Sequence, residues 1–125
     1  MISSDVVRKQ LAGVAATDHA PAAAYRPTFS QRTYRELGRR AAQAVADGSA
    51  ALVDATSRRA GDRAAFTEGF ADAAALTFVQ CVAPDAVLAQ RAIARDHDPA
   101  RISDATAAMI ADLPALLDVR LTRRP

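Results

Sequence analysis

Two carboxylates and a small set of arginines are the residues of this chain that could carry chemistry. Asp5 follows two serines at the expected start of a helix, and Arg8 comes three residues later. If a parallel strand precedes it, Asp5 lies at the carboxyl edge of a sheet, where it could accept the proton of an attacking hydroxyl. The simpler interpretation is an acidic first-turn residue that complements the helix dipole, with Arg8 solvated, and spacing alone favours it.

The second carboxylate, Asp54, ends the short apolar run of residues 51–53 and precedes Thr56. An acid at the end of a buried strand can hold Mg²⁺ directly or through water, as in the Walker-B arrangement. The pattern is weak, because turns favour Asp after many strands. Three arginines follow, the last of them Arg63, and they could reach an anionic ligand or cover a helix face.

A pair of arginines, Arg91 and Arg95, falls one turn apart on a predicted helix, just before the polar segment 96–101. Two arginines beside a mobile loop could form a lid that clamps a transferring phosphate. They could equally form a solvated helix face paired with nearby aspartates. Both interpretations stay open on the sequence alone.

Composition and charge describe the setting of these residues. The chain has 125 residues, half of them hydrophobic and many of those alanine, which suits one domain. Its net charge of +2, with Lys9 as the only lysine, is too small to predict nucleic-acid binding. A single cysteine, no signal peptide and no apolar run of about 18–20 residues predict a cytoplasmic protein with no membrane segment.

Apolar spacing, capping residues and prolines predict the elements that position these side chains. Helices are expected over residues 5–12, 30–47, 60–73, 84–95 and 103–112, with a long loop at 14–29. Strands are expected at the apolar runs 49–53 and 75–82 and at 116–122. Strands separated by helices predict an α/β fold with a parallel sheet and right-handed crossovers. The alternative is an all-α, alanine-rich protein in which the apolar runs are not strands.

Taken in order, these segments resemble a small P-loop kinase or AAA-type ATP-binding domain. The segments that carry the resemblance are Ile2-Ser-Ser-Asp5 with Arg8, Tyr25…Ser30…Thr33-Tyr34, Gly48, Val53-Asp-Ala-Thr56, Cys81-Val-Ala-Pro84 and the Arg91/Arg95 pair. Similar families include the kinase domain of phage polynucleotide kinase, zeta toxins and gluconate kinases. The most similar is the ATP-binding domain fused to aminoglycoside-phosphotransferase-like proteins. The resemblance implies a three-layer α/β fold over residues 1–125, with a lid at about 91–104.

The resemblance also implies an activity and roles for the residues. Asp5 matches the carboxylate that activates the acceptor hydroxyl, and Arg91 and Arg95 match lid arginines over the nucleotide's phosphates. Arg8 and Arg63 match contacts to the substrate. The implied reaction is ATP-dependent phosphorylation of a hydroxyl on a small molecule or on a polynucleotide end.

ATP and Mg²⁺ are the cofactors that the resemblance implies, with Asp54 as the Mg²⁺ ligand and Thr56 beside it. The family's GxxxxGK[ST] loop, whose backbone N–H groups and lysine hold the phosphates, should precede Ser3 and occurs nowhere in the 125 residues. We therefore expect negligible kinase activity from this chain alone. It could be a kinase-family domain that lacks its N-terminal part, or a non-catalytic interaction module on a degenerate kinase scaffold. Without the central strand, two apolar strand edges would be exposed, to be covered in a homodimer or by a missing segment.

Overall fold

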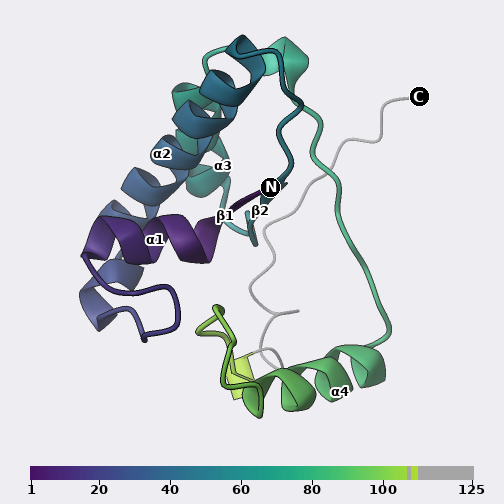
Figure 1. The fold of residues 1–125 in the computed structure, drawn as a ribbon. Coiled ribbons are helices and arrows are strands. Elements are labelled where there is room, and N and C mark those ends of the chain that lie inside the picture. The colour runs from purple at the N-terminus through teal and green to yellow at the C-terminus, as the bar shows by residue number, and fades with distance from the viewer. Residues whose placement is uncertain (107, 110–125) are drawn as a thin grey trace.

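The computed structural model describes residues 1–106 and 108–109 (Figure 1). The elements in chain order, with η for a short 3-10 helix, are β1 (Ile2–Ser3), α1 (Ser4–Ala12), η1 (Ala22–Tyr25), α2 (Pro27–Ala46), β2 (Val53–Asp54), α3 (Ala60–Phe70), η2 (Ala73–Ala75) and α4 (Asp85–Asp96). Helices therefore dominate, and they accompany a small parallel sheet. The mixed α/β character that the sequence predicts is confirmed.

The sheet is a parallel pair of strands within the described part of the chain. Ile2 lies opposite Val53 and Ser3 opposite Asp54, and the Ile2 N–H donates to the Leu52 carbonyl at 2.8 Å. This pairing excludes the all-α alternative. β2 shares only Val53 with the predicted strand 49–53 and includes Asp54. It is two residues long because β1 offers only two residues before α1 begins.

The hydrophobic core lies where α2 and α3 pack together, with α1 alongside. α2 contributes Tyr34 and Leu37 and α3 contributes Phe66 and Phe70, all of them buried. The two phenylalanine rings lie parallel with centroids 6.3 Å apart, and Val7 of α1 joins the same cluster. These positions recur every three or four residues, as an amphipathic helix requires.

Two glycines set the distance between α2 and α3. A β-carbon on Gly38 would lie 2.2 Å from the Phe66 carbonyl oxygen, and one on Gly69 would lie 2.1 Å from the Arg35 carbonyl oxygen. Both distances are far below van der Waals contact, so neither position accepts a side chain at the present spacing. The helix backbones therefore touch at this crossing.

The helix boundaries agree with the sequence at some ends and differ at others. α1 ends as predicted before Gly13, which adopts the left-handed conformation with φ +74°. α2 begins at Pro27, three residues before the predicted cap Ser30, because proline is pre-organised for the first helical position. Ser30 is buried inside the helix instead. α3 ends at Phe70 and not at residue 73, since Ala71 takes a left-handed conformation with φ +67°.

The predicted strand over residues 75–82 is wrong. After η2, residues 76–84 run without strand pairing, and Val79 and Val82 are 80% and 83% exposed. β-forming residues make a strand only where a neighbouring strand accepts their hydrogen bonds, and none of the described residues does so. The sheet of the described residues therefore has two strands, and the predicted three-layer arrangement, with helices on both faces of a larger sheet, is not confirmed. Figure 1 shows this connection leading away from α1–α3 to α4.

The last part of the described chain contains the predicted helix after Pro84, which forms as α4 and ends at Asp96. Residues 103–106, where the next helix was expected to begin, are not helical. The rest of that helix falls largely outside the described residues, and the predicted strand at 116–122 lies wholly outside them. Among the helices that the structure describes, none combines the length and apolar character needed to cross a membrane.

Candidate functional site

The two carboxylates singled out in the sequence belong to the same edge of the parallel pair. Ser3 is the register partner of Asp54, and Asp5 follows two residues later in the first turn of α1. Because parallel strands end on the same side of a sheet, both acids lie at its carboxyl edge, where α/β proteins bind ligands. Asp54 and Thr56 are exposed there, whereas Asp5 is partly buried.

Asp5 sits among several polar groups. Burial raises the pKa of its carboxyl, against a hydrogen bond from the Ser103 side chain and the charge of Arg8. Lys9 and Asp104 also act on it electrostatically. A carboxylate whose pKa is raised is a stronger proton acceptor, which is the property that a general base needs.

Arg8 is buried, and its guanidinium is held by the protein itself. Its Nη1 donates to the Ala24 carbonyl and, at 3.1 Å, to the Ser30 hydroxyl. The guanidinium also lies over the Tyr25 ring, 4.8 Å from its centroid. Arg8 thereby joins α1 to η1 and α2, while its buried Nε has no hydrogen-bond partner among the described residues.

A third carboxylate, Asp62 in the first turn of α3, lies in the same region and was not identified from the sequence. Burial raises its pKa, and Arg59 and Arg8 are the charges that oppose the rise most. Arg8 thus acts electrostatically on both Asp5 and Asp62. An acid in a helix first turn is common, so nothing in the local pattern distinguished Asp62.

Lys9 and Asp104 form a network with Asp5 that sequence reasoning also missed. The Lys9 Nζ lies 3.0 Å from Asp104 Oδ1, and the lysine is only 1% exposed. Asp104 in turn accepts hydrogen bonds from the Ala20 N–H at 3.0 Å and from the Tyr25 hydroxyl. Burial alone would raise the pKa of Asp104, but the bonds from Tyr25, Ala20 and Lys9 outweigh it and hold the pKa below its ordinary value.

The loop after β2 is shaped by Tyr34 and Arg63. The Tyr34 hydroxyl accepts the Ser57 N–H at 2.9 Å and lies 3.3 Å from the Thr56 hydroxyl. The Arg63 Nη1 donates to the carbonyls of Ser57 and Arg58 at 2.8 and 3.0 Å. Arg63 therefore fixes the turn that follows Asp54.

The predicted lid arginines lie on α4. Arg91 is exposed and Arg95 is partly buried, and the buried Arg95 Nε has no partner among the described residues. Within that part of the chain, no hydrogen bond or ion pair joins either arginine to Asp5 or Asp54. Figure 1 shows why, since α4 lies well away from β1 and β2.

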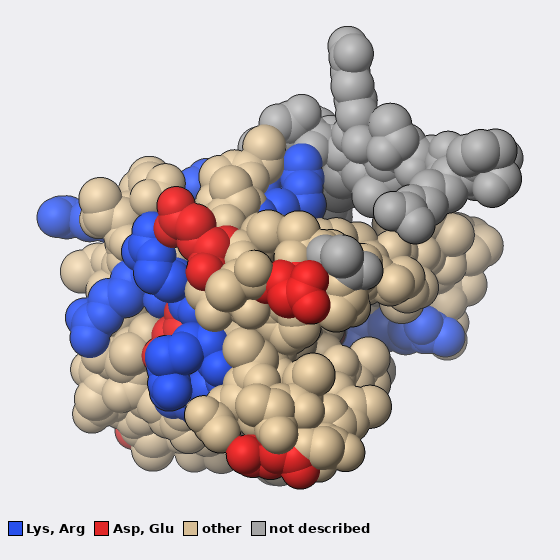
Figure 2. Space-filling view, turned by 90° about the horizontal axis from the view of Figure 1, so that it is seen from above, with Lys and Arg blue, Asp and Glu red and all other residues tan. Residues whose placement is uncertain are grey.

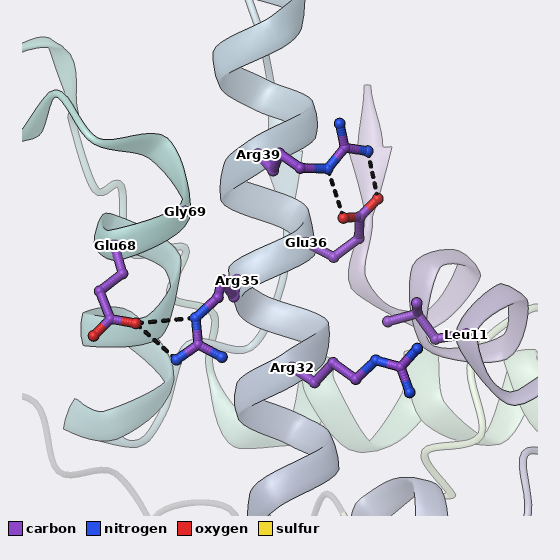
Figure 3. A pocket seen from close by; sticks show the side chains of 7 residues that line it. All are labelled: Leu11, Arg32, Arg35, Glu36, Arg39, Glu68 and Gly69. Carbon is purple, nitrogen blue, oxygen red and sulfur yellow. Dashed lines mark hydrogen bonds and ion pairs between the residues drawn. The ribbon is translucent and has the colours of Figure 1, made fainter.

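A shallow groove of about 600 Å³ lies elsewhere, across α1, α2 and α3. Figure 3 shows two ion pairs among the charged side chains that line it, Arg35 with Glu68 at 2.7 Å and Arg39 with Glu36 at 2.8 Å, and draws Arg32 outside both pairs. The face drawn in Figure 2 likewise places basic and acidic side chains beside one another. Neither feature offers a field of one sign to an anionic ligand.

Mg²⁺ in a protein needs oxygen ligands, mainly from carboxylates, phosphates and water. Within residues 1–106 and 108–109 no three His, Cys, Asp or Glu side chains gather into a metal site. Mg²⁺ bound with a nucleotide needs only one or two protein carboxylates, the rest of its shell being water and phosphate, and the exposed Asp54 fits such a role. The phosphate-binding half of that site, a glycine-lysine loop, does not occur in the sequence.

These features define the class of protein. It is an α/β domain that carries acidic residues at the carboxyl edge of parallel strands, where helices begin. A family model described as AAA domain matches residues 1–119, and the chain belongs to this family of P-loop kinase-like domains. No curated protein and no solved structure matches the chain. AAA-type domains generally bind ATP and Mg²⁺.

Proposed function

We propose that this chain is the acceptor-side and lid part of an ATP- and Mg²⁺-dependent kinase-like domain that phosphorylates a hydroxyl group. The acceptor would be a small molecule or the end of a polynucleotide. The observation that carries the proposal is the strand register, in which Ser3 lies opposite Asp54. That register brings Asp5 and Asp54 to one edge, in a chain of a P-loop kinase-like family.

In this proposal Asp5 takes the proton of the acceptor hydroxyl. Its partial burial and raised pKa support that role, because general bases work best when their pKa approaches the working pH. Arg8 and Arg63 would position the acceptor or its phosphate. The contacts of both arginines with backbone carbonyls support an indirect part, in which they hold the walls of the site.

Asp54 and Thr56 would face the nucleotide and its Mg²⁺, which neutralises phosphate charge when bound. Arg91 and Arg95 would approach the phosphates only if α4 moved toward β1 and β2. Because the 125 residues hold no glycine-lysine loop, we propose that they have negligible kinase activity alone. The loop would come from another segment or another chain.

The experiment follows radiolabelled phosphate from the γ position of ATP to alcohols and to 5′-hydroxyl polynucleotide ends. We expect no transfer by the 125 residues alone. If the DNA upstream of Met1 encodes an in-frame GK[ST] loop, the extended chain should transfer phosphate, and Asp5→Asn should slow it about 10²–10⁴-fold. Full activity of that variant, or an extended chain that binds no ATP, would contradict the proposal.

A non-catalytic interaction module is the second candidate, favoured by one observation. Residues 76–84 are unpaired in the described structure, and Val79 and Val82 project into solvent. Exposed apolar side chains in a β-prone segment can recruit another polypeptide by strand addition. Binding of a protein partner without any nucleotide binding, in both the chain and its extended form, would favour this candidate over the kinase.

A further inference from the structure

We infer that residues 102–104 form a strap that closes over Asp5 and must open before an acceptor hydroxyl can reach it. The role of Asp5 as the base rests on the proposed function, whereas the strap rests on contacts alone. These contacts join α1 to the strap, and Lys9 and Ile102 are 93 residues apart in sequence. In the closed form the strap would keep an acceptor hydroxyl away from Asp5, so the protein would inhibit its own activity.

The first anchor of the strap is Lys9, the only lysine of the chain. Its Nζ binds the strap at both ends, through the Ile102 carbonyl at 2.5 Å and Asp104 Oδ1 at 3.0 Å. A third bond goes to the Ala16 carbonyl at 3.0 Å. An ammonium group that is 1% exposed needs this full set of oxygen partners, because a buried charge without partners is strongly unfavourable.

The second anchor is the Asp104 carboxylate, which is bound by the loop between α1 and η1 and by Tyr25, the last residue of η1. Oδ2 accepts the Ala20 N–H at 3.0 Å and the Tyr25 hydroxyl, and Oδ1 lies 3.2 Å from His19 Nδ1. One side chain thus ties the strap to a loop that has little regular structure of its own. Lys9 lies one turn after Asp5 on α1, and the residues that bind Asp104 follow the same helix in the chain.

The middle residue, Ser103, gives the strap its specific relation to Asp5. It stands between Ile102 and Asp104, both of which are held by Lys9, and Lys9 lies one turn after Asp5 on the same face of α1. Its side chain opposes the rise in the pKa of the Asp5 carboxyl, and its Oγ accepts the Ala105 N–H at 3.2 Å. A serine side chain is a primary alcohol, the same functional group as the proposed acceptor. We therefore expect the Ser103 hydroxyl and the acceptor hydroxyl to compete for the Asp5 carboxylate.

Opening of the strap would be a local event. The strap is three residues long. Its opening would break few apolar contacts, because Ile102 is already 40% exposed. Segments with few buried apolar contacts open at lower free energy than the core. The helices α2 and α3 would keep their packing while the strap opens.

The test measures how fast the Asp5 carboxyl reacts with a water-soluble carbodiimide and an amine nucleophile, mapped by mass spectrometry in the full chain. Asp104→Asn should raise the rate on the order of tenfold, because removing one partner of a buried ion pair weakens the closed form strongly. Ser103→Ala should raise it severalfold, because it removes only the competing hydroxyl. Asp98→Asn, which removes an exposed acid from the same region, should leave the rate unchanged.

Hydrogen exchange of the α2 amides, measured in parallel, separates opening of the strap from loss of the fold. Faster labelling of Asp5 with α2 still protected supports the strap. Unchanged labelling in Asp104→Asn overturns it. If Asp104→Asn loses α2 protection, Ser103→Ala decides, and an unchanged Asp5 rate in that variant overturns the inference. No nucleotide is used, so a failure of the proposed kinase activity would leave this result standing.

Discussion

The pKa values of individual carboxylates in this protein are shifted in opposite directions because their surroundings differ. Asp5 lies partly buried beside other polar groups, and burial raises its pKa. Glu36 lies on α2 between two arginines, whose hydrogen bonds lower its pKa to about 2. The first arrangement makes a proton acceptor at the expense of stability, and the second contributes to stability. Site residues often show this conflict between function and stability.

Replacing Asp5 by asparagine should therefore stabilise the chain. The folded-state pKa of Asp5 lies above the unfolded value of 3.8, so the folded protein loses stability as the pH rises through that range. Asparagine cannot ionise and escapes this loss. The melting temperature of Asp5→Asn should exceed that of the parent by a few degrees near pH 7, with the gain absent near pH 3. Asp18→Asn, an exposed loop substitution, should change neither value, and a loss of stability in Asp5→Asn at neutral pH would contradict the assignment.

Glu36→Gln should show the opposite behaviour. The Glu36 carboxylate accepts hydrogen bonds from Arg39 and Arg40 at 2.8 Å, and its folded-state pKa lies below the ordinary value of 4.5. Its contribution to stability is present above pH 4.5 and is lost as the pH falls toward 2. Urea unfolding should show Glu36→Gln less stable at pH 7, with the difference vanishing near pH 2. Glu68→Gln is the control, since an exposed pair contributes less than about 1 kcal/mol.

At the scale of elements, the sequence predicted helices better than strands. Helix limits depend on nearby residues, so Gly13 at the end of α1 could be identified from its own position. The start of α2 was placed late because Ser30 and Pro27 both carry a start signal, and the proline is the one that the helix uses. Strand formation at residues 76–84 depends on a partner strand that local sequence does not specify. The same reason limits prediction of the site. Asp104 and Lys9 form an ion pair although most of the chain separates them in sequence, and no local pattern shows this.

The crossing of α2 and α3 gives a prediction about glycine. Gly38→Ala and Gly69→Ala each place a methyl group within about 2 Å of facing backbone, so the helices must separate and uncover part of the core. We expect each to lower the free energy of unfolding by about 1–3 kcal/mol, as overpacking of a tight contact does. Gly61→Ala is the matched control, since its nearest neighbour is the Gln31 side chain at 3.7 Å. It should raise stability by about 0.5–1 kcal/mol, the helix preference for alanine. Equal effects at all three glycines in thermal or urea unfolding would contradict the close crossing.

Across the whole molecule, polar contacts hold together parts that apolar packing does not. The core of α1, α2 and α3 is apolar, whereas residues 102–104 return to α1 through Lys9 and Asp104. The chain between α3 and residues 102–104 includes the extended segment 76–84 and α4. Leu76 and Phe78 pack against the core at the start of this stretch, and a few charged groups hold its far end. Local sequence patterns could not show the partners of these groups, because the partners are far apart in sequence.

The same segment predicts how the chain behaves in solution. Phe78 meets the Phe66 ring edge-on with centroids 6.1 Å apart, but Val79 and Val82 beyond it are 80% and 83% exposed. An unpaired, β-prone apolar segment is a template for pairing with another chain, so we expect concentration-dependent self-association in sedimentation velocity. Val79→Glu combined with Val82→Glu should abolish it, because repelled charges cannot pair closely. Val45→Glu, an exposed valine on helix α2, should leave association unchanged. A chain that stays monomeric at every concentration, or a double variant that associates as the parent does, would show that this segment recruits no second copy.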